Sequence, residues 1–104
     1  RGAEQKQLES QLAKVKRLIV TEIRQAMNNY AASFKIFDAY RQRKAEMDDL
    51  LQRAEKSFSL GGITVLELLD TQKTYRDFHV KYHQALAQNY LQRELVKVYT
   101  GTLK

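Results

Sequence analysis

The sequence has no cysteine and no proline, and only 4 of its 104 residues are glycine. Without cysteine the chain has neither a disulfide scaffold nor a Cys-ligated zinc or iron–sulfur site. The lack of proline and the scarcity of glycine exclude collagen-like chains, proline-rich linkers and most loop-rich folds. A chain of this length is one small domain or a piece of a larger protein.

Long apolar runs are also missing. No unbroken apolar run exceeds three residues, and Leu18 to Val20 is one of them. A membrane-spanning helix needs about 20 apolar residues. The chain begins at Arg1 rather than at Met, so we expect it to be a processed or excised segment.

The charge is dispersed rather than gathered into a stripe. Lys and Arg number 18 against 12 Asp and Glu, a net charge of +6. A nucleic-acid interface would need a one-sided basic stripe, and the six tyrosines follow helix faces instead of forming a base-stacking platform. The sequence also offers no nucleophile–base pair and no phosphate-binding loop. We therefore expect no nucleic-acid binding, no enzymatic activity and no cofactor.

Apolar or small residues recur at steps of three and four through the first half of the chain, which predicts a long amphipathic helix over 3–57. The repeat is mostly seven residues from Ile23 onward and eleven residues before it. Eleven-residue spacing unwinds a left-handed supercoil, so the first part should be nearly straight. At 1.5 Å per residue such a helix would be about 80 Å long.

The helical pattern breaks over 58–64, which contains the adjacent glycines Gly61 and Gly62. Thr64 and Glu67 have the Thr-x-x-Glu spacing of a capping box, a signal for the start of a helix. A second helix is predicted over 65–100, with Gly101 as a candidate C-cap. The fold class is therefore all-α: a long antiparallel helical hairpin, coiled-coil-like, with a tip loop over 58–64.

The two arms of this hairpin are unequal. With the turn near residue 61, residue i should face roughly residue 122 − i. The residues that would then extend beyond the second helix with nothing to cover them are Leu8, Leu12, Val15, Leu18 and Ile19. A repeating apolar stripe without a partner is unfavourable in water, so we expect another segment or another copy to cover it.

The loop and the second helix resemble the outer membrane efflux protein family. The matching stretch is Phe58-Ser-Leu-Gly61-Gly-Ile-Thr64-Val-Leu-Glu67-Leu-Leu69-Asp70-Thr-Gln72. It is similar to the family pattern aromatic-x-x-Gly-x-x-Ser/Thr-x-x-Asp/Glu-x-Leu-Asp. Gly101 to Leu103 lie at the family's usual distance from the Asp, and the resemblance covers essentially the whole chain.

The resemblance implies a fragment of a trimeric channel. Members of the family have a β-barrel in the outer membrane and a long α-helical tunnel in the periplasm, and each protomer contributes two unequal hairpins to the tunnel. This chain resembles the second hairpin, without the barrel and the first hairpin. Membrane contact would come only through that missing barrel. The implied location is the periplasmic portion of a Gram-negative outer-membrane protein.

The tip loop, Leu60, Gly61, Gly62, Ile63 and Thr64, is the first candidate site. In the family this tip docks a periplasmic adaptor (membrane fusion) protein, which links the channel to an inner-membrane pump. Glycines let two backbones approach closely, and Leu60 and Ile63 offer apolar contacts. The alternative is that the loop is simply the turn that any helical hairpin needs.

Glu67 and Asp70 lie one helical turn apart. Both could simply favour the start of the second helix, where the helix dipole is positive. In the family, acids at these positions line the channel entrance, and three copies would attract cations. One family member has a Tyr and an Arg that help to shut the entrance where this chain has Phe58 and Ile63, so closure here would need other contacts.

His79 and His83 are spaced i, i+4 and could approach one metal ion. Two ligands do not make a tight site, so we interpret them as polar histidines of the helix surface and expect no metal.

We conclude that the chain is the tunnel segment of an efflux channel, a passive conduit in a tripartite export pump. The alternative is a structural or interaction hairpin, such as the coiled coil of an adaptor. The sequence does not identify the exported substrate, the pump or the oligomeric state of the isolated segment.

Overall fold

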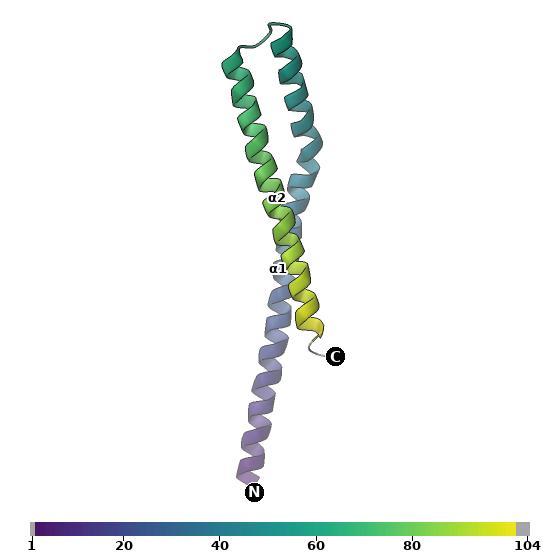
Figure 1. Ribbon diagram of the computed structural model, residues 1–104. Helices are drawn as coiled ribbons and strands as arrows, with labels where there is room; N and C mark the ends of the chain where they lie inside the picture. The colour runs from purple at the N-terminus through teal and green to yellow at the C-terminus, as the bar shows by residue number, and fades with distance from the viewer. Residues whose placement is uncertain (1, 102–104) are drawn as a thin grey trace.

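The computed structural model describes residues 2–101 and contains two helices in that range, α1 (Gly2–Ser59) and α2 (Val65–Gly101). The helices run antiparallel and are joined by a short turn, so the chain forms one hairpin (Figure 1). The molecule is very elongated, with extents of 88 × 21 × 14 Å. The predicted fold class, an all-α antiparallel hairpin, is confirmed.

The helix ends differ slightly from the predicted ones. α1 continues through Phe58 and Ser59, which the sequence placed in the loop, because the Leu60 amide still donates to the Lys56 carbonyl at 3.1 Å. At the other end, α2 extends through Gly101, one residue beyond the predicted end of the helix. The family resemblance over 102–104 lies outside the described residues.

The register between the helices is the predicted one. Residue 33 should face residue 89, and Ser33 Oγ forms a hydrogen bond with Asn89 Oδ1 at 3.2 Å. Nearer the tip, the Tyr75 hydroxyl donates to Asp48 Oδ1 at 2.8 Å, within one residue of the predicted pairing. The position of the Gly-Gly turn was therefore enough to align the two helices.

The core is a thin seam between α1 and α2. Its buried residues are Ala26, Ser33, Leu68, Phe78 and Ala85. Small side chains at three of these five positions allow close helix contact. Rings fill the space between the helices further toward the tip, where the Tyr40 and Phe78 ring centroids are 5.7 Å apart. A hairpin this thin has no deep interior, so most of its side chains stay partly accessible.

The N-terminal part of α1 extends well past the C-terminal end of α2 (Figure 1). On this overhang Leu8, Leu12, Val15 and Leu18 are exposed, as predicted. Ile19 is half-buried, so the last member of the predicted stripe is partly covered. The stripe without a partner is therefore shorter than expected.

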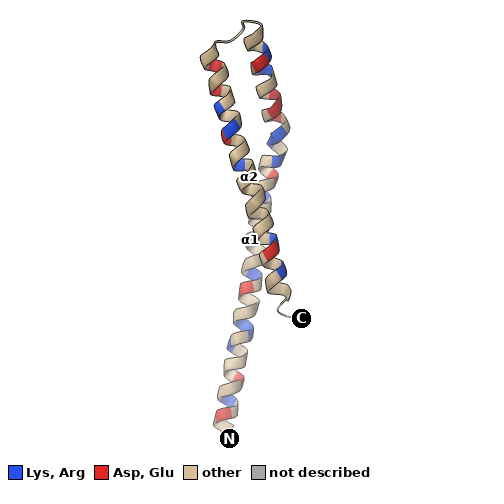
Figure 2. Cartoon of the chain, viewed as in Figure 1, with Lys and Arg blue, Asp and Glu red and all other residues tan. Residues whose placement is uncertain are grey.

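Charged residues of both signs are interspersed along the two helices (Figure 2). Neither α1 nor α2 contains a stretch that is apolar enough over a sufficient length to cross a bilayer within residues 2–101.

Candidate functional site

The tip of the hairpin begins with a Schellman motif, a common way to end an α-helix. The Gly61 amide donates to the Phe58 carbonyl at 3.0 Å, and the Gly62 amide donates to the Ser57 carbonyl at 2.7 Å. These bonds satisfy two of the carbonyl groups that the end of α1 would otherwise leave unpaired. The backbone leaves the helix in a fixed direction and turns toward α2.

The two glycines serve different purposes in this turn. Gly61 has a φ of +79°, a conformation that residues with a Cβ rarely adopt, although the space around it is open. Gly62 has no positive φ, but a Cβ built on it would lie 3.3 Å from the Ser57 carbonyl oxygen. The first glycine is therefore favoured by its conformation, and the second is favoured by its close approach to the Ser57 carbonyl oxygen.

Thr64 caps the start of α2, as the sequence predicted. Thr64 Oγ1 accepts a hydrogen bond from the Glu67 amide at 3.1 Å. The return bond of a full capping box, from the Thr64 amide to the Glu67 carboxylate, is not formed in the described part of the chain. The Glu67 carboxylate is thus free of the cap and stays exposed.

The apolar surface of the tip differs from the predicted one. Leu60 is 76% exposed, as expected, but Ile63 is half-buried. Its place is taken by Leu66, which is 75% exposed on the first turn of α2. Phe58, Val65 and Leu69 are also exposed, so an apolar patch surrounds the turn. The predicted tip site ended at Thr64 and therefore left out Leu66. A signal was present, because the adjacent apolar residues Val65 and Leu66 just after the N-cap cannot both face the partner helix.

Glu67 and Asp70 are both exposed near the start of α2. Their backbone carbonyls accept hydrogen bonds from the hydroxyls of Thr71 and Thr74, each at 3.1 Å. Within residues 2–101 neither carboxylate forms an ion pair or a hydrogen bond. These two carboxylates, unpaired within residues 2–101, can therefore act on solutes or on neighbouring charges near the tip.

A polar cluster lies between the helices below the tip. Asp48 of α1 accepts the hydrogen bond from Tyr75, and His79 Nε2 lies 4.0 Å from the same Asp48 oxygen. The hydrogen bond to Asp48 is the main reason that the pKa of Tyr75 is raised, with burial and the charges of Asp48 and Glu55 adding to it. The phenol therefore remains a donor.

The histidines are not two equivalent surface residues. His83 is exposed, but His79 packs against Asp48 and its Nε2 atom is buried without a hydrogen-bond partner. The interpretation of His79 as a helix-surface histidine is therefore wrong. The two imidazole rings lie 5.8 Å apart. Across residues 2–101 no group of three or more His, Asp or Glu side chains is arranged to hold a metal ion.

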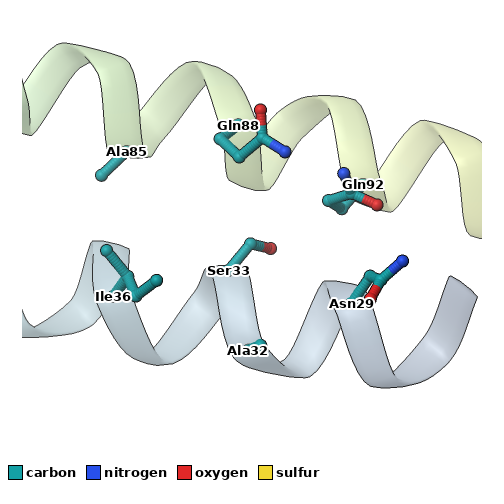
Figure 3. A pocket seen from close by; sticks show the side chains of 7 residues that line it. All are labelled: Asn29, Ala32, Ser33, Ile36, Ala85, Gln88 and Gln92. Atoms are coloured by element: carbon teal, nitrogen blue, oxygen red, sulfur yellow. The ribbon is translucent and has the colours of Figure 1, made fainter. Parts of the chain in front are cut away.

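A groove of about 380 Å³ runs along the seam further from the tip (Figure 3). It is lined by Asn29, Ala32, Ser33, Ile36, Ala85, Gln88 and Gln92. Alanine and serine leave room between the helices, and the amide side chains gather toward one end of the groove, as Figure 3 shows. With no charged residue in its lining, the groove suits the side chains of another helix better than an ionic ligand.

Comparison with known proteins gives one clear relative. The chain is 33% identical over 95 residues to Outer membrane protein TolC of Escherichia coli (strain K12), an alignment that covers 89% of this chain. The chain belongs to the TolC-like outer membrane efflux family. It spans 19% of the length of that relative. No protein-family model matches the sequence, and no solved structure matches it at a significant level.

Membership explains the unusual shape of this TolC-like hairpin. A stand-alone domain would be expected to bury more of its apolar side chains, whereas this chain keeps exposed apolar residues on the overhang, on the flanks and at the tip. We expect another segment or another copy to cover such surfaces.

Proposed function

We propose that this hairpin is a periplasmic tunnel segment of an outer-membrane efflux channel, and that its tip docks a periplasmic adaptor protein. In the complete protein it would be the second of two hairpins in each protomer of a homotrimer. The channel would be a passive conduit for substrates driven by an inner-membrane pump. The observation that carries the docking proposal is the exposed apolar patch around the Gly61–Gly62 turn.

That patch has the properties of a contact surface. Leu60 and Leu66 lie on either side of a turn whose glycines carry no side chain, and both leucines are about three-quarters exposed. A partner backbone can approach the glycines closely while its apolar side chains cover the leucines. A turn with no partner would be expected to carry polar residues at these exposed positions.

The tunnel proposal is supported by apolar residues on the flanks of the hairpin. Val20, Met27 and Phe34 are exposed at seven-residue spacing along one side of α1. Leu91 and Val98 are exposed at the same spacing on α2. A helix that contacts neighbours on two sides needs apolar residues on more than one face, as in a closed ring of helices.

The exposed carboxylates of Glu67 and Asp70 suit a position at the channel entrance. Three copies would place six carboxylates around one opening, which would favour cations over anions. Replacing both with Gln and Asn in the intact protein should alter cation passage while leaving adaptor docking unchanged, since charge changes but shape hardly does. Unchanged cation passage would contradict the entrance role.

A second candidate function is an interaction hairpin of an adaptor-type protein, favoured by the same exposed tip. The two differ in what flanks the hairpin along the chain. A similar hairpin and strand-rich segments upstream support the channel, whereas a flanking lipoyl-like β-domain supports the adaptor.

The docking proposal is tested at Leu60 and Leu66 in the intact protein. Leu60→Ser and Leu66→Ser should reduce both export and site-specific crosslinking of the tip to the adaptor, with normal abundance in the outer membrane. Leu60→Met and Leu66→Met are the matched controls, because they keep an apolar side chain of similar volume. If the serine variants crosslink and export as well as the methionine variants, the tip is only a turn.

A further inference from the structure

The cluster of Asp48, Tyr75 and His79 has a feature that a tunnel wall does not require. Tyr75 and His79 lie one turn apart on α2, with ring centroids 4.5 Å apart. Both side chains approach the same oxygen of Asp48 on α1. Tyr75 already donates a hydrogen bond to that oxygen at 2.8 Å. His79 approaches it to 4.0 Å through a nitrogen that is shielded from water and has no hydrogen-bond partner.

The proton on His79 decides whether this approach is favourable. A neutral imidazole either leaves an N–H unsatisfied at Nε2 or turns a lone pair toward the carboxylate, and both are unfavourable where water has no access. A protonated imidazole donates from both nitrogens and carries a charge opposite to that of Asp48. The contact between α1 and α2 should therefore strengthen as the pH falls and weaken as it rises.

We infer that Asp48, Tyr75 and His79 form a proton-sensitive clasp that draws α1 and α2 together below the tip when His79 is protonated and releases them when it is neutral. Tyr75 holds the carboxylate in place in both states, because its phenol remains a donor. The clasp concerns the spacing of the two helices in one hairpin, so it does not depend on adaptor docking.

Other charged groups around the clasp would modulate it without replacing it. On α2, His83 is the other group that can become positive, with its ring 5.8 Å from that of His79, and Tyr82 lies between them in sequence. On α1, Glu55 adds negative charge near Tyr75. Lys44, one turn before Asp48, is exposed and forms no ion pair in the described chain. Asp48 is thus the anion placed to respond to His79.

The test measures the spacing of the helices between the clasp and the tip. Cysteines at the exposed positions Arg53 and Lys73 would carry spin labels in the intact protein, and pulsed electron paramagnetic resonance would give their distance distribution. Between about pH 8 and about pH 5.5, the range in which histidine titrates, the distribution should shift to shorter distances and narrow. His79→Gln and Asp48→Asn should each abolish that shift.

His83→Gln is the matched control, since it removes the neighbouring histidine of the same helix and leaves the clasp intact. It should keep the full pH-dependent shift. The inference is overturned if the labelled protein shows no shift with pH, if the shift persists in His79→Gln, or if His83→Gln abolishes it equally. Retention of the shift in Asp48→Asn would also overturn it, because Asp48 is the proposed acceptor.

Discussion

The paired part of the hairpin and its N-terminal overhang are built from the same sequence pattern but end in different environments. In the paired part the repeating positions meet α2, and Ala26 and Ser33 become buried. On the overhang the same kind of repeat leaves Leu8 and Leu12 more than half exposed. Periodicity therefore sets which face of a helix is apolar, and the length of the partner decides how much of that face is covered.

The seam and the overhang should therefore affect different properties, the seam the stability of the hairpin and the overhang its association. Side chains in the seam should contribute to the free energy of unfolding of the hairpin, whereas side chains on the overhang should contribute only when something binds there. The tip lies between these cases, because its turn is needed for pairing and its leucines are available to a partner.

The largest effect on unfolding is expected at Phe78, which is 8% exposed and contacts the rings of Tyr40 and Tyr82. Phe78→Ala should lower the free energy of unfolding by about 3 kcal/mol, since it removes the largest buried side chain of the seam. Urea denaturation of the 104-residue chain, followed by circular dichroism at fixed concentration, measures this. Val80→Ala on the same helix, at a position 55% exposed, should change it by no more than about 0.5 kcal/mol. Equal effects would mean that the seam is not the core.

An intermediate effect is expected at the turn that brings the two helices together. Gly61→Val places a β-branched residue at a φ of +79° and should cost about 1–3 kcal/mol by the same measurement. Gly62→Ala should cost about 1 kcal/mol or less, because the added Cβ meets only the Ser57 carbonyl oxygen at 3.3 Å. In the intact protein Gly61→Val should also impair export, while folding and outer-membrane insertion persist.

The reverse order of these two costs would contradict the separate requirements assigned to the glycines. Unchanged export and unchanged adaptor crosslinking in Gly61→Val would argue against docking at the turn itself.

The sequence predicted the helices and their pairing better than it predicted the turn. The hairpin and its register were predictable, because a turn at two adjacent glycines fixes which residues face each other, and Ser33 does meet Asn89. The exposure of Leu66 instead of Ile63 was not predicted. Helical periodicity ends at a turn, and the direction in which the chain re-enters a helix depends on the Schellman geometry at Gly61 and Gly62.

The clasp escaped sequence reasoning for a different reason. The predicted register places His79 opposite residue 43, whereas its actual neighbour, Asp48, lies five residues further along α1. The His79 side chain reaches Asp48 diagonally across the seam, and periodicity gives no information about such diagonal contacts. The i, i+4 spacing pointed to a pairing of His79 with His83 on the same helix, whereas the close polar contact of His79 is with Asp48 on α1.

The smallest effect on unfolding is expected on the overhang, where the triple change Leu8→Gln, Leu12→Gln and Val15→Gln should leave the hairpin's urea transition within about 0.5 kcal/mol at low concentration. These side chains contact nothing in α2, and Gln has a helix propensity close to that of Leu.

The effect of these overhang side chains should appear in association instead. The unmodified 104-residue chain should self-associate as its concentration rises, because a repeating apolar row seeks a partner, and the triple variant should sediment as a monomer. Val80→Gln, at an exposed apolar position of α2 outside the row of Leu91 and Val98, is the matched control and should leave association in place. A strictly monomeric unmodified chain at high concentration would show that the overhang attracts no second copy. A triple variant that unfolds much more easily as a monomer would show that the overhang belongs to the hairpin's own core, and the division drawn between the two regions would fail.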